Sequence, residues 1–203
     1  MSWKVWNKNE ILCNVESPFE TSNYTIYFAF SNGDKYRMYY NPFDKSFGKK
    51  IEDRLSFKIF DPNESLIGKF VGRTHKTGKF IGGYQFYELN LYDKQYIGYE
   101  VGRGRQGVAL CLYLNNELIG IIDKNTTVIN FQDDYNIYLT DSKYLEIATL
   151  FDIYYDSTKF SDVGEIALYS QKETYMVTTN KELKNKYDPN FISRIKAMDG
   201  ITD

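Results

Sequence analysis

The stretch Asp141-Ser-Lys-Tyr-Leu-Glu-Ile-Ala-Thr-Leu-Phe-Asp-Ile-Tyr-Tyr155 decides the fold of this chain. It contains no Gly or Pro, and Asp141 is a suitable N-cap for a helix that begins after it. Apolar residues surround most of the helical circumference, and only Glu146, Thr149 and Asp152 form a narrow polar stripe. A helix that is apolar on nearly every side has to be enclosed, and this one is too short for a membrane span of about 20 residues. We therefore predict a central helix over 141–155 that is surrounded by protein.

The composition of the 203-residue chain favours a single, mainly β domain over residues 1–203. Aromatic residues make up 17% of the sequence, and such residues favour pleated, half-buried strands. The net charge of -2 provides no general attraction to nucleic acid or to anionic lipid. We therefore expect no nucleic-acid partner, and any electrostatic binding has to come from a local patch.

The cysteines and the hydrophobic segments indicate a cytoplasmic protein. Cys13 and Cys111 lie far apart and belong to no Cys-x-x-Cys or Cys/His cluster, and the N-terminus has no secretory hydrophobic region. Both thiols are therefore predicted to be free in a reducing compartment. No run approaches the roughly 18 apolar residues of a transmembrane helix, so that membrane contact, if it occurs, is expected to be peripheral.

The residues before the central helix alternate between β-type runs and turns. Residues 1–22 show no clean period, and we interpret them as an irregular N-terminal arm or an edge strand. The runs 24–30 and 35–40 flank Asn32-Gly33, which predicts a hairpin with a type I′ turn and positive φ at both central residues. Further strands are predicted at 55–60, 66–72, 84–92, 96–102, 108–114, 118–122, 126–131 and 135–139.

Three return strands share a repeated pattern that places Gly68, Gly98 and Gly120 directly after an apolar residue and Ile. Gly inside a strand marks a bend, a bulge or the close approach of another backbone. We predict that these glycines curve the sheet and leave room for a helix about 10 Å wide, which requires roughly ten to twelve strands. The predicted fold is mainly β, with a closed antiparallel β-barrel of about twelve strands, formed largely by residues 24–139, around the central hydrophobic helix.

The C-terminal extension, residues 160–203, is predicted to add strands and a peripheral helix. The apolar positions of that helix form one stripe, so we expect it to pack on the outside of the sheet. The predicted elements are strands at 163–169 and 174–178, a helix from Lys181 capped by Asn180, and a break near Asp188-Pro189 before the helix resumes through Ile195.

Hairpins in series that end in an apolar helix resemble the tubby C-terminal-like superfamily, which includes tubby, the phospholipid scramblases, the LURP-one proteins and small bacterial relatives. Residues 147–156 are similar to the end of the scramblase core helix, and the hairpins at 66–68 and 118–120 are similar to the family's paired strands. The resemblance covers about residues 55–156 and implies a twelve-stranded barrel threaded by a helix. It departs from tubby and the scramblases in one respect, because residues 157–203 follow the core helix here.

The resemblance implies lipid-headgroup binding, as in tubby, or lipid traffic, as in the scramblases. None of tubby's phosphoinositide-contacting residues matches a position of this chain, so none is transferred. The resemblance therefore informs the fold more than the activity.

Two basic segments are the candidate ligand-binding sites. Arg73 and Lys76 lie in the predicted loop 71–79, and Arg103 and Arg105 lie among the glycines of the predicted turn 102–107. Guanidinium groups bind phosphate or carboxylate in a forked geometry, and glycines let backbone N–H groups approach an anion. The alternative is that Gly-Arg-Gly-Arg is a solvated hairpin turn whose glycines supply positive φ.

No catalytic residue, metal ligand or cofactor is predicted. His75 is the only histidine and has no recognisable nucleophile or acidic partner, so we expect it to be solvent-exposed. Asp152 is a candidate buried carboxylate, although hydrogen bonding to nearby tyrosines or to a polar barrel mouth is the simpler interpretation. Asp133 and Asp134 are expected to be turn residues.

Three functional hypotheses remain open from the sequence. The first is a non-catalytic binding or scaffold domain that meets a small anion or a phospholipid headgroup through the loops at one barrel end. The second is a small hydrolase or lipid-modifying enzyme with its site at the barrel mouth. The third is a protein-interaction module that uses residues 160–203 to contact a partner that the sequence does not identify.

Overall fold

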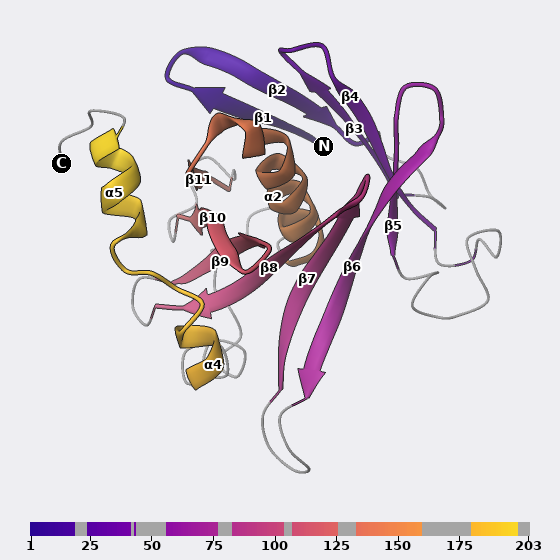
Figure 1. The fold of residues 1–203 in the computed structure, drawn as a ribbon. Helices are drawn as coiled ribbons and strands as arrows, with labels where there is room; N and C mark the ends of the chain where they lie inside the picture. Colours follow the sequence, from indigo (N-terminus) through magenta and orange to yellow (C-terminus); the bar gives the residue numbers. More distant parts are fainter. Residues whose placement is uncertain are drawn as a thin grey trace. The chain divides into compact units, whose positions relative to one another are not determined.

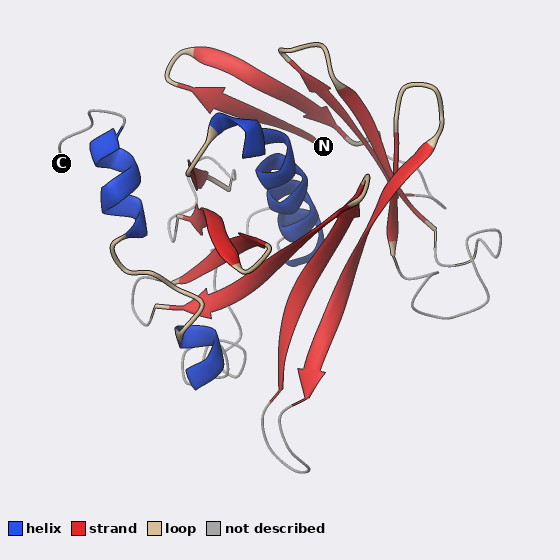
Figure 2. Ribbon diagram, viewed as in Figure 1, coloured by secondary structure: helices blue, strands red, loops and turns tan. Residues whose placement is uncertain are grey.

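A computed structural model of the chain describes residues 1–18, 24–41, 43, 56–76, 83–103, 107–125, 133–159 and 180–198 (Figure 1). These residues form an antiparallel sheet of eleven strands in which each strand pairs with its neighbours in sequence (Figure 2). The strands are β1 (Ser2–Asn7), β2 (Glu10–Glu16), β3 (Tyr24–Phe30), β4 (Lys35–Tyr40), β5 (Phe57–Phe60), β6 (Leu66–Lys76), β7 (Gly83–Leu91), β8 (Lys94–Gly102), β9 (Val108–Leu114), β10 (Glu117–Lys124) and β11 (Tyr135–Leu139).

The chain divides into two compact units. The first consists of Met1–Gly72 with Glu88–Gln95, and the second of Arg73–Tyr87 with Tyr96–Asp203. The sequence predicted a mainly β fold, and this is confirmed. Closure into a barrel was predicted to use strands at 163–169 and 174–178, which lie outside the described residues, as does the predicted strand at 126–131.

The first unit begins with a hairpin, β1 paired with β2, where the sequence suggested an irregular arm or an edge strand. The chain turns at Lys8, which has a φ of 54°, and the pairing register shifts between Val5 and Trp6. This irregularity explains why the apolar residues of this segment follow no clean period of two.

The hairpin of β3 and β4 is confirmed, but its turn is of a different type from the one predicted. Gly33 has a φ of 96°, whereas the φ of Asn32 is not positive. The Gly33 N–H donates to the Phe30 carbonyl at 3.0 Å, and the Phe30 N–H donates to the Asp34 carbonyl at 2.9 Å. A longer loop with only Gly33 in the left-handed region therefore replaces the two-residue type I′ turn.

The three repeated glycines differ in what surrounds them. At Gly98 a Cβ atom would lie 2.7 Å from the Phe151 ring, so this glycine makes room for the helix as predicted. At Gly68 and Gly120 the nearest obstacles belong to neighbouring strands, and both residues lie beside a shift in the pairing register. Gly68 and Gly120 therefore allow a β-bulge and the close approach of a neighbouring strand, whereas Gly98 makes room for the helix.

The predicted central helix is α2 (Leu145–Lys159), which follows a short 3₁₀ turn, η3 (Ser142–Tyr144). Asp141 caps this turn through a hydrogen bond from the Lys143 N–H, 3.0 Å long. All ten residues from Ile147 to Asp156 are buried, including the polar ones. The expectation of a helix that is buried on every side is thus confirmed for this segment, and α2 contacts β10 and β11.

Two further helices, α4 (Lys181–Lys184) and α5 (Phe191–Met198), complete the second unit. Asn180 caps α4 as predicted, by accepting from the N–H groups of Glu182 and Leu183. Phe191 and Ile195 of α5 pack in one buried cluster with residues of β8, β9 and β10. The predicted peripheral helix is therefore present, in two segments.

Strand β9 is covered on both of its faces. Ala109 and Cys111 belong to the cluster that includes α5, whereas the Leu110 side chain lies with the Phe151 ring beside Gly98. Alternate residues of a strand point to opposite faces. The second unit is thus a layered structure with α2 on the inner face of the sheet and α5 on its outer face (Figure 1).

Candidate functional site

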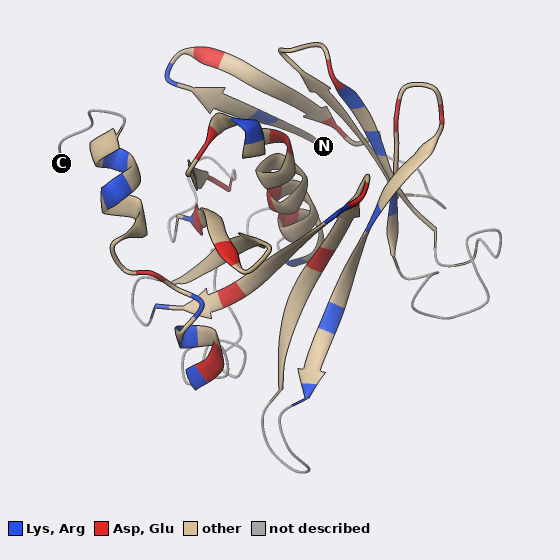
Figure 3. Ribbon diagram, viewed as in Figure 1, with Lys and Arg blue, Asp and Glu red and all other residues tan. Residues whose placement is uncertain are grey.

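Three of the four basic candidates lie in the described part of the second unit. Arg73 and Lys76 lie on β6, which extends to residue 76 where the sequence predicted a loop, and Arg103 directly follows β8. Strands β6 and β8 flank β7 in an antiparallel sheet, so their C-terminal ends lie at the same end of the sheet. Arg105 lies outside the described residues. Figure 3 shows the basic positions near the end of β6 and, on α4, basic and acidic positions together.

Arg103 is already engaged within the protein. Its guanidinium group forms an ion pair with Asp123 of β10 and lies 5.9 Å from the centre of the Tyr187 ring. Burial by itself lowers the pKa of Arg103, but the charge and hydrogen bond of Asp123 and the Tyr187 hydroxyl outweigh it and raise the pKa. The Arg103 N–H also donates to the Gly107 carbonyl at 2.8 Å and closes the turn. Arg103 therefore supports the turn, whatever else it contacts.

A row of aromatic rings crosses four strands on the outer face, near these cations. The distances between ring centres are 4.9 Å for His75 and Tyr84, 5.9 Å for Phe86 and Tyr99, and 5.6 Å for Tyr99 and Tyr113. Burial raises the pKa of Tyr84, Tyr99 and Tyr113, so these hydroxyls stay neutral at physiological pH. We call His75, Tyr84, Phe86, Tyr99 and Tyr113 the aromatic strip.

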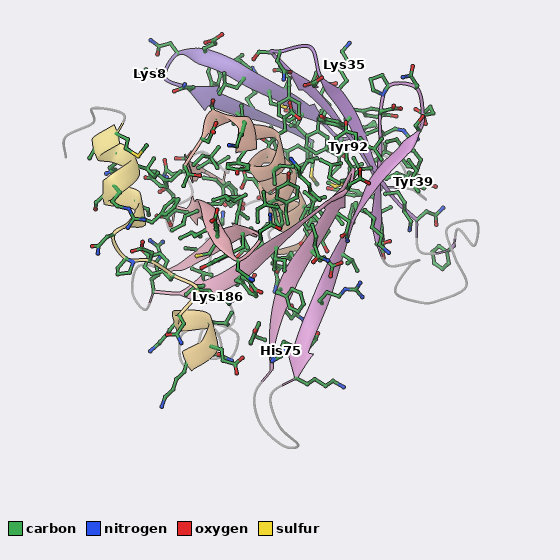
Figure 4. All side chains as sticks on the ribbon, viewed as in Figure 1. Lys8, Lys35, Tyr39, His75, Tyr92 and Lys186 are labelled. Carbon is green, nitrogen blue, oxygen red and sulfur yellow. The ribbon has the colours of Figure 1, made fainter. Side chains whose placement is uncertain are left out.

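The C-terminal segment covers part of the aromatic strip. The Lys186 ammonium lies 4.8 Å from the Tyr99 ring centre and 5.4 Å from that of Tyr113, whose hydroxyl donates to the Lys186 carbonyl at 2.8 Å. His75 lies 3.7 Å from the Glu182 carboxylate on α4, and its side chain is half exposed, in agreement with the prediction. Figure 4 labels His75 near the end of the β6–β7 hairpin and Lys186 between α4 and α5.

Apart from His75, the residues of the aromatic strip were not singled out from the sequence. Its signal was nevertheless present, because Tyr84 and Phe86 are two positions apart on β7 and therefore share a face. Locating Tyr99 and Tyr113 beside them requires the pairing register of β7, β8 and β9, which local sequence patterns leave open.

A second group of polar residues lies on the inner face, around the C-terminal half of α2. The Tyr135 hydroxyl donates to the Asp156 carboxylate at 2.6 Å. The Lys124 ammonium forms an ion pair with Asp133 and lies 4.6 Å from the Tyr135 ring centre. We call Lys124, Asp133, Tyr135, Asp152 and Asp156 the buried polar cluster.

Asp152 differs from Asp133, which forms an ion pair with Lys124, and from Asp156, which accepts from Tyr135, because its Oδ1 atom is buried with neither kind of partner among the described residues. Burial, and then the nearby charge of Asp156, raise the pKa of Asp152 well above its usual value, while Lys124 acts in the opposite direction. The Thr149 hydroxyl, three residues earlier on the same helix, is also buried without a described partner. The sequence led us to expect hydrogen bonds from tyrosines to Asp152, but the tyrosine hydroxyl of this cluster, that of Tyr135, donates to Asp156 instead.

A further polar contact anchors the same helix. The Tyr87 hydroxyl donates to Glu100 at 2.9 Å, and the Lys159 ammonium lies 3.8 Å from the same carboxylate. The Tyr87 ring packs edge-on against Tyr154 and Tyr155 of α2. The contacts of Tyr87 and Glu100 with α2 thus hold this helix against β7 and β8.

The buried polar cluster does not converge on a metal site. Within the described ranges, no group of three or more His, Cys, Asp or Glu side chains is arranged to hold a metal ion. Both cysteines are buried and free, as predicted, and burial raises the pKa of Cys111 to about 12. A thiol with so high a pKa is not a nucleophile at neutral pH.

None of the helices in the described part of the chain combines the length and hydrophobicity that a membrane crossing requires.

Comparisons with protein-family models, with curated proteins and with solved structures found no significant match to this chain. The resemblance to the tubby-like superfamily therefore stays a prediction.

Proposed function

We propose that this chain is a non-catalytic binding domain that meets an anionic ligand through Arg73, Lys76 and Arg105. The observation that carries the proposal is the parallel direction of β6 and β8, because it supports a common location for Lys76 and the turn that follows Gly102. Arg103 holds that turn through Asp123 and Gly107. Its role in the proposal is to position the turn rather than to bind.

The ligand chemistry that suits these residues is a phosphate or carboxylate group. Guanidinium and ammonium groups bind such anions through charge-assisted hydrogen bonds. A lipid headgroup and a free phosphate share this chemistry, and the tubby-like resemblance favours the headgroup. A peripheral membrane contact from the cytoplasmic side follows from that choice.

The proposal also includes the closed barrel of the tubby-like superfamily. The burial of Ile147–Asp156 on all sides supports an enclosing wall, and Gly98 supports the close approach of that wall to Phe151. Strands at 163–169 and 174–178 would close it. Backbone hydrogen exchange tests this point, because amides of closing strands exchange slowly, whereas fast exchange of both segments would contradict closure.

The binding proposal is tested with vesicles and with phosphate. We expect the protein to co-sediment with vesicles that contain anionic phospholipid, less so at high salt, and not with neutral vesicles. Lys76→Glu combined with Arg105→Glu should abolish this binding. Lys8→Glu combined with Lys35→Glu is the matched control, since both lysines are exposed and the change in charge is the same.

Inorganic phosphate separates the two ligand sources. Competition by millimolar phosphate would indicate a site for a free anion, whereas binding to anionic vesicles that resists phosphate would indicate a surface for headgroups. If neither probe binds, or if Lys76→Glu with Arg105→Glu binds like the control, the proposed function is wrong.

A further inference from the structure

A shallow hollow lies on the first unit, where β1 begins and β2 ends. It has a volume of about 440 Å³, which is within the range of small-molecule sites, and it is open to solvent. Its lining consists of Met1, Ser2, Glu16, Ser17, Pro18 and Tyr27. None of these residues belongs to the anion site proposed above.

Strand pairing brings three side chains of the hollow together. Met1 and Ser17 exchange both of their ladder hydrogen bonds, at 2.8 and 2.9 Å. The next pair along the ladder, Ser2 and Glu16, is therefore of the non-hydrogen-bonded kind, in which the side chains lie closest. Glu16 is in turn the partner of Tyr27 on β3. Directly paired residues share one face of a sheet, so these three side chains form a row across β1, β2 and β3.

The side chains of this row are available to a ligand. Ser2 and Glu16 are exposed, and Tyr27 is 46% exposed. Neither the Glu16 carboxylate nor the Tyr27 hydroxyl forms a hydrogen bond or an ion pair with any residue that the structure describes. The row therefore offers a carboxylate acceptor, two hydroxyl groups and one exposed aromatic ring.

The positive charge next to Tyr27 is already used within the first unit. Arg37 is the cross-strand partner of Tyr27 on β4. Its guanidinium group forms an ion pair with Glu64 and lies 4.2 Å from the centre of the Phe60 ring, which belongs to β5 on the other side of β4. Arg37 is therefore neutralised and directed away from the hollow.

The charges at the hollow favour a ligand without net charge. Glu16 supplies the one charged side chain among the lining residues, and it disfavours an anion. The amino group of Met1, which donates to the Ser17 carbonyl at 2.8 Å, and Lys4 on the same face of β1 disfavour a cation. A neutral ligand that is rich in hydroxyl groups avoids both repulsions and can still donate to the carboxylate.

We propose that this hollow binds a carbohydrate, with a pyranose ring stacked on Tyr27 and its hydroxyl groups hydrogen-bonded to Glu16 and Ser2. A pyranose has a flat face of C–H groups and an edge of hydroxyl groups, and these match an exposed aromatic ring beside a carboxylate. An open site with one stacking ring predicts dissociation constants of about 1–10 mM for a monosaccharide. The carbohydrate site belongs to the first unit, whereas the residues of the proposed anion site belong to the second.

Methyl β-glucoside and sorbitol form the test pair, because both are neutral polyols and only the glucoside has a ring face. We expect titrations followed by saturation-transfer NMR to show binding of the glucoside and at least roughly tenfold weaker binding of sorbitol. Tyr27→Ala should abolish glucoside binding, whereas Tyr27→Phe retains the ring and should keep most of it. Glu16→Gln should weaken it roughly three- to tenfold, because an amide oxygen is a weaker acceptor than a carboxylate.

The matched controls change similar residues outside the hollow. Glu10→Gln removes an exposed acid from the same strand, and Tyr92→Ala removes an aromatic side chain that is 64% exposed. Both variants should bind the glucoside like the parent protein. Near-ultraviolet circular dichroism checks that Tyr27→Ala keeps its fold.

Three results would overturn the carbohydrate site. The first is equal affinity for sorbitol and the glucoside, and the second is unchanged glucoside binding by Tyr27→Ala. The third is absence of glucoside binding at several times the expected dissociation constant, and binding of butylammonium in its place would identify a cation site. Because Tyr27→Ala keeps Lys76 and Arg105, its binding to anionic vesicles should not change, so each of these failures is distinct from failure of the proposed function.

Discussion

Asp152 and Gly98 are two single residues whose surroundings are determined by the buried helix α2. Asp152 brings a carboxyl group into the interior, where its Oδ1 atom has no described partner. Gly98 removes a side chain from β8 at the point where the Phe151 ring arrives. The first residue costs stability and the second permits packing, so substitutions at the two sites should act in opposite directions.

Asp152→Asn should stabilise the protein at neutral pH. The pKa of Asp152 is higher in the folded protein than in the unfolded chain, because burial favours the protonated carboxyl group. The stabilisation from this protonated group is therefore fully present below the unfolded pKa of about 4, and it is lost as the pH rises through the folded pKa. The neutral amide avoids that loss, and we expect a gain of about 1–3 kcal/mol at pH 7 that disappears in acid. Urea unfolding across this pH range measures it. Asp93→Asn, at an exposed turn residue, is the control. If the Asp152→Asn protein is less stable than the parent protein at pH 7, the prediction is wrong.

Gly98→Ala should destabilise the protein by about 1–3 kcal/mol. The added methyl group would lie 2.7 Å from the Phe151 ring and 3.2 Å from Leu110, and overpacking of a dense core has this cost. Phe151→Leu in the same chain should recover part of the loss, because the smaller side chain vacates the contact. A double-mutant cycle in urea measures the coupling, and additive effects would show that the two residues do not meet.

At the level of elements, the C-terminal helices are part of the core rather than an appendage. Leu183, Phe191 and Ile195 are buried, the last two in the cluster that also contains Cys111. The hypothesis of a partner-binding extension can therefore use the exposed side of α5, but not these three residues. The end of β6 also differs from the prediction. The polar sequence after Val71 predicted a loop, whereas the strand continues to Lys76.

Phe191→Ala should destabilise the second unit by about 3 kcal/mol and expose Cys111. We expect the Cys111 thiol to react faster with maleimide in this variant, measured in a Cys13→Ala background so that one thiol is present. Met198→Ala lies on the same helix at a side chain that is 73% exposed, and it should leave the rate unchanged. Equal rates in both variants would show that α5 does not protect the thiol.

At the level of the whole molecule, the sequence by itself determined the β-rich class, the buried helix, most hairpins and the cap residues Asp141 and Asn180. These features depend on local signals: the period of apolar residues, turn residues, and the hydrogen bond from a cap to its own helix. The free cysteines also followed from sequence, because neither residue has a neighbour of suitable chemistry.

Only the tertiary structure decided which side chains meet. The ion pair of Arg103 with Asp123, the aromatic strip and the buried polar cluster each join strands or helices that are distant along the chain. Pairing register fixes such contacts, and a shift by one residue would turn every side chain of a strand to the other face. Local patterns specify where a strand forms, but the energy that selects its register comes from packing against the rest of the protein.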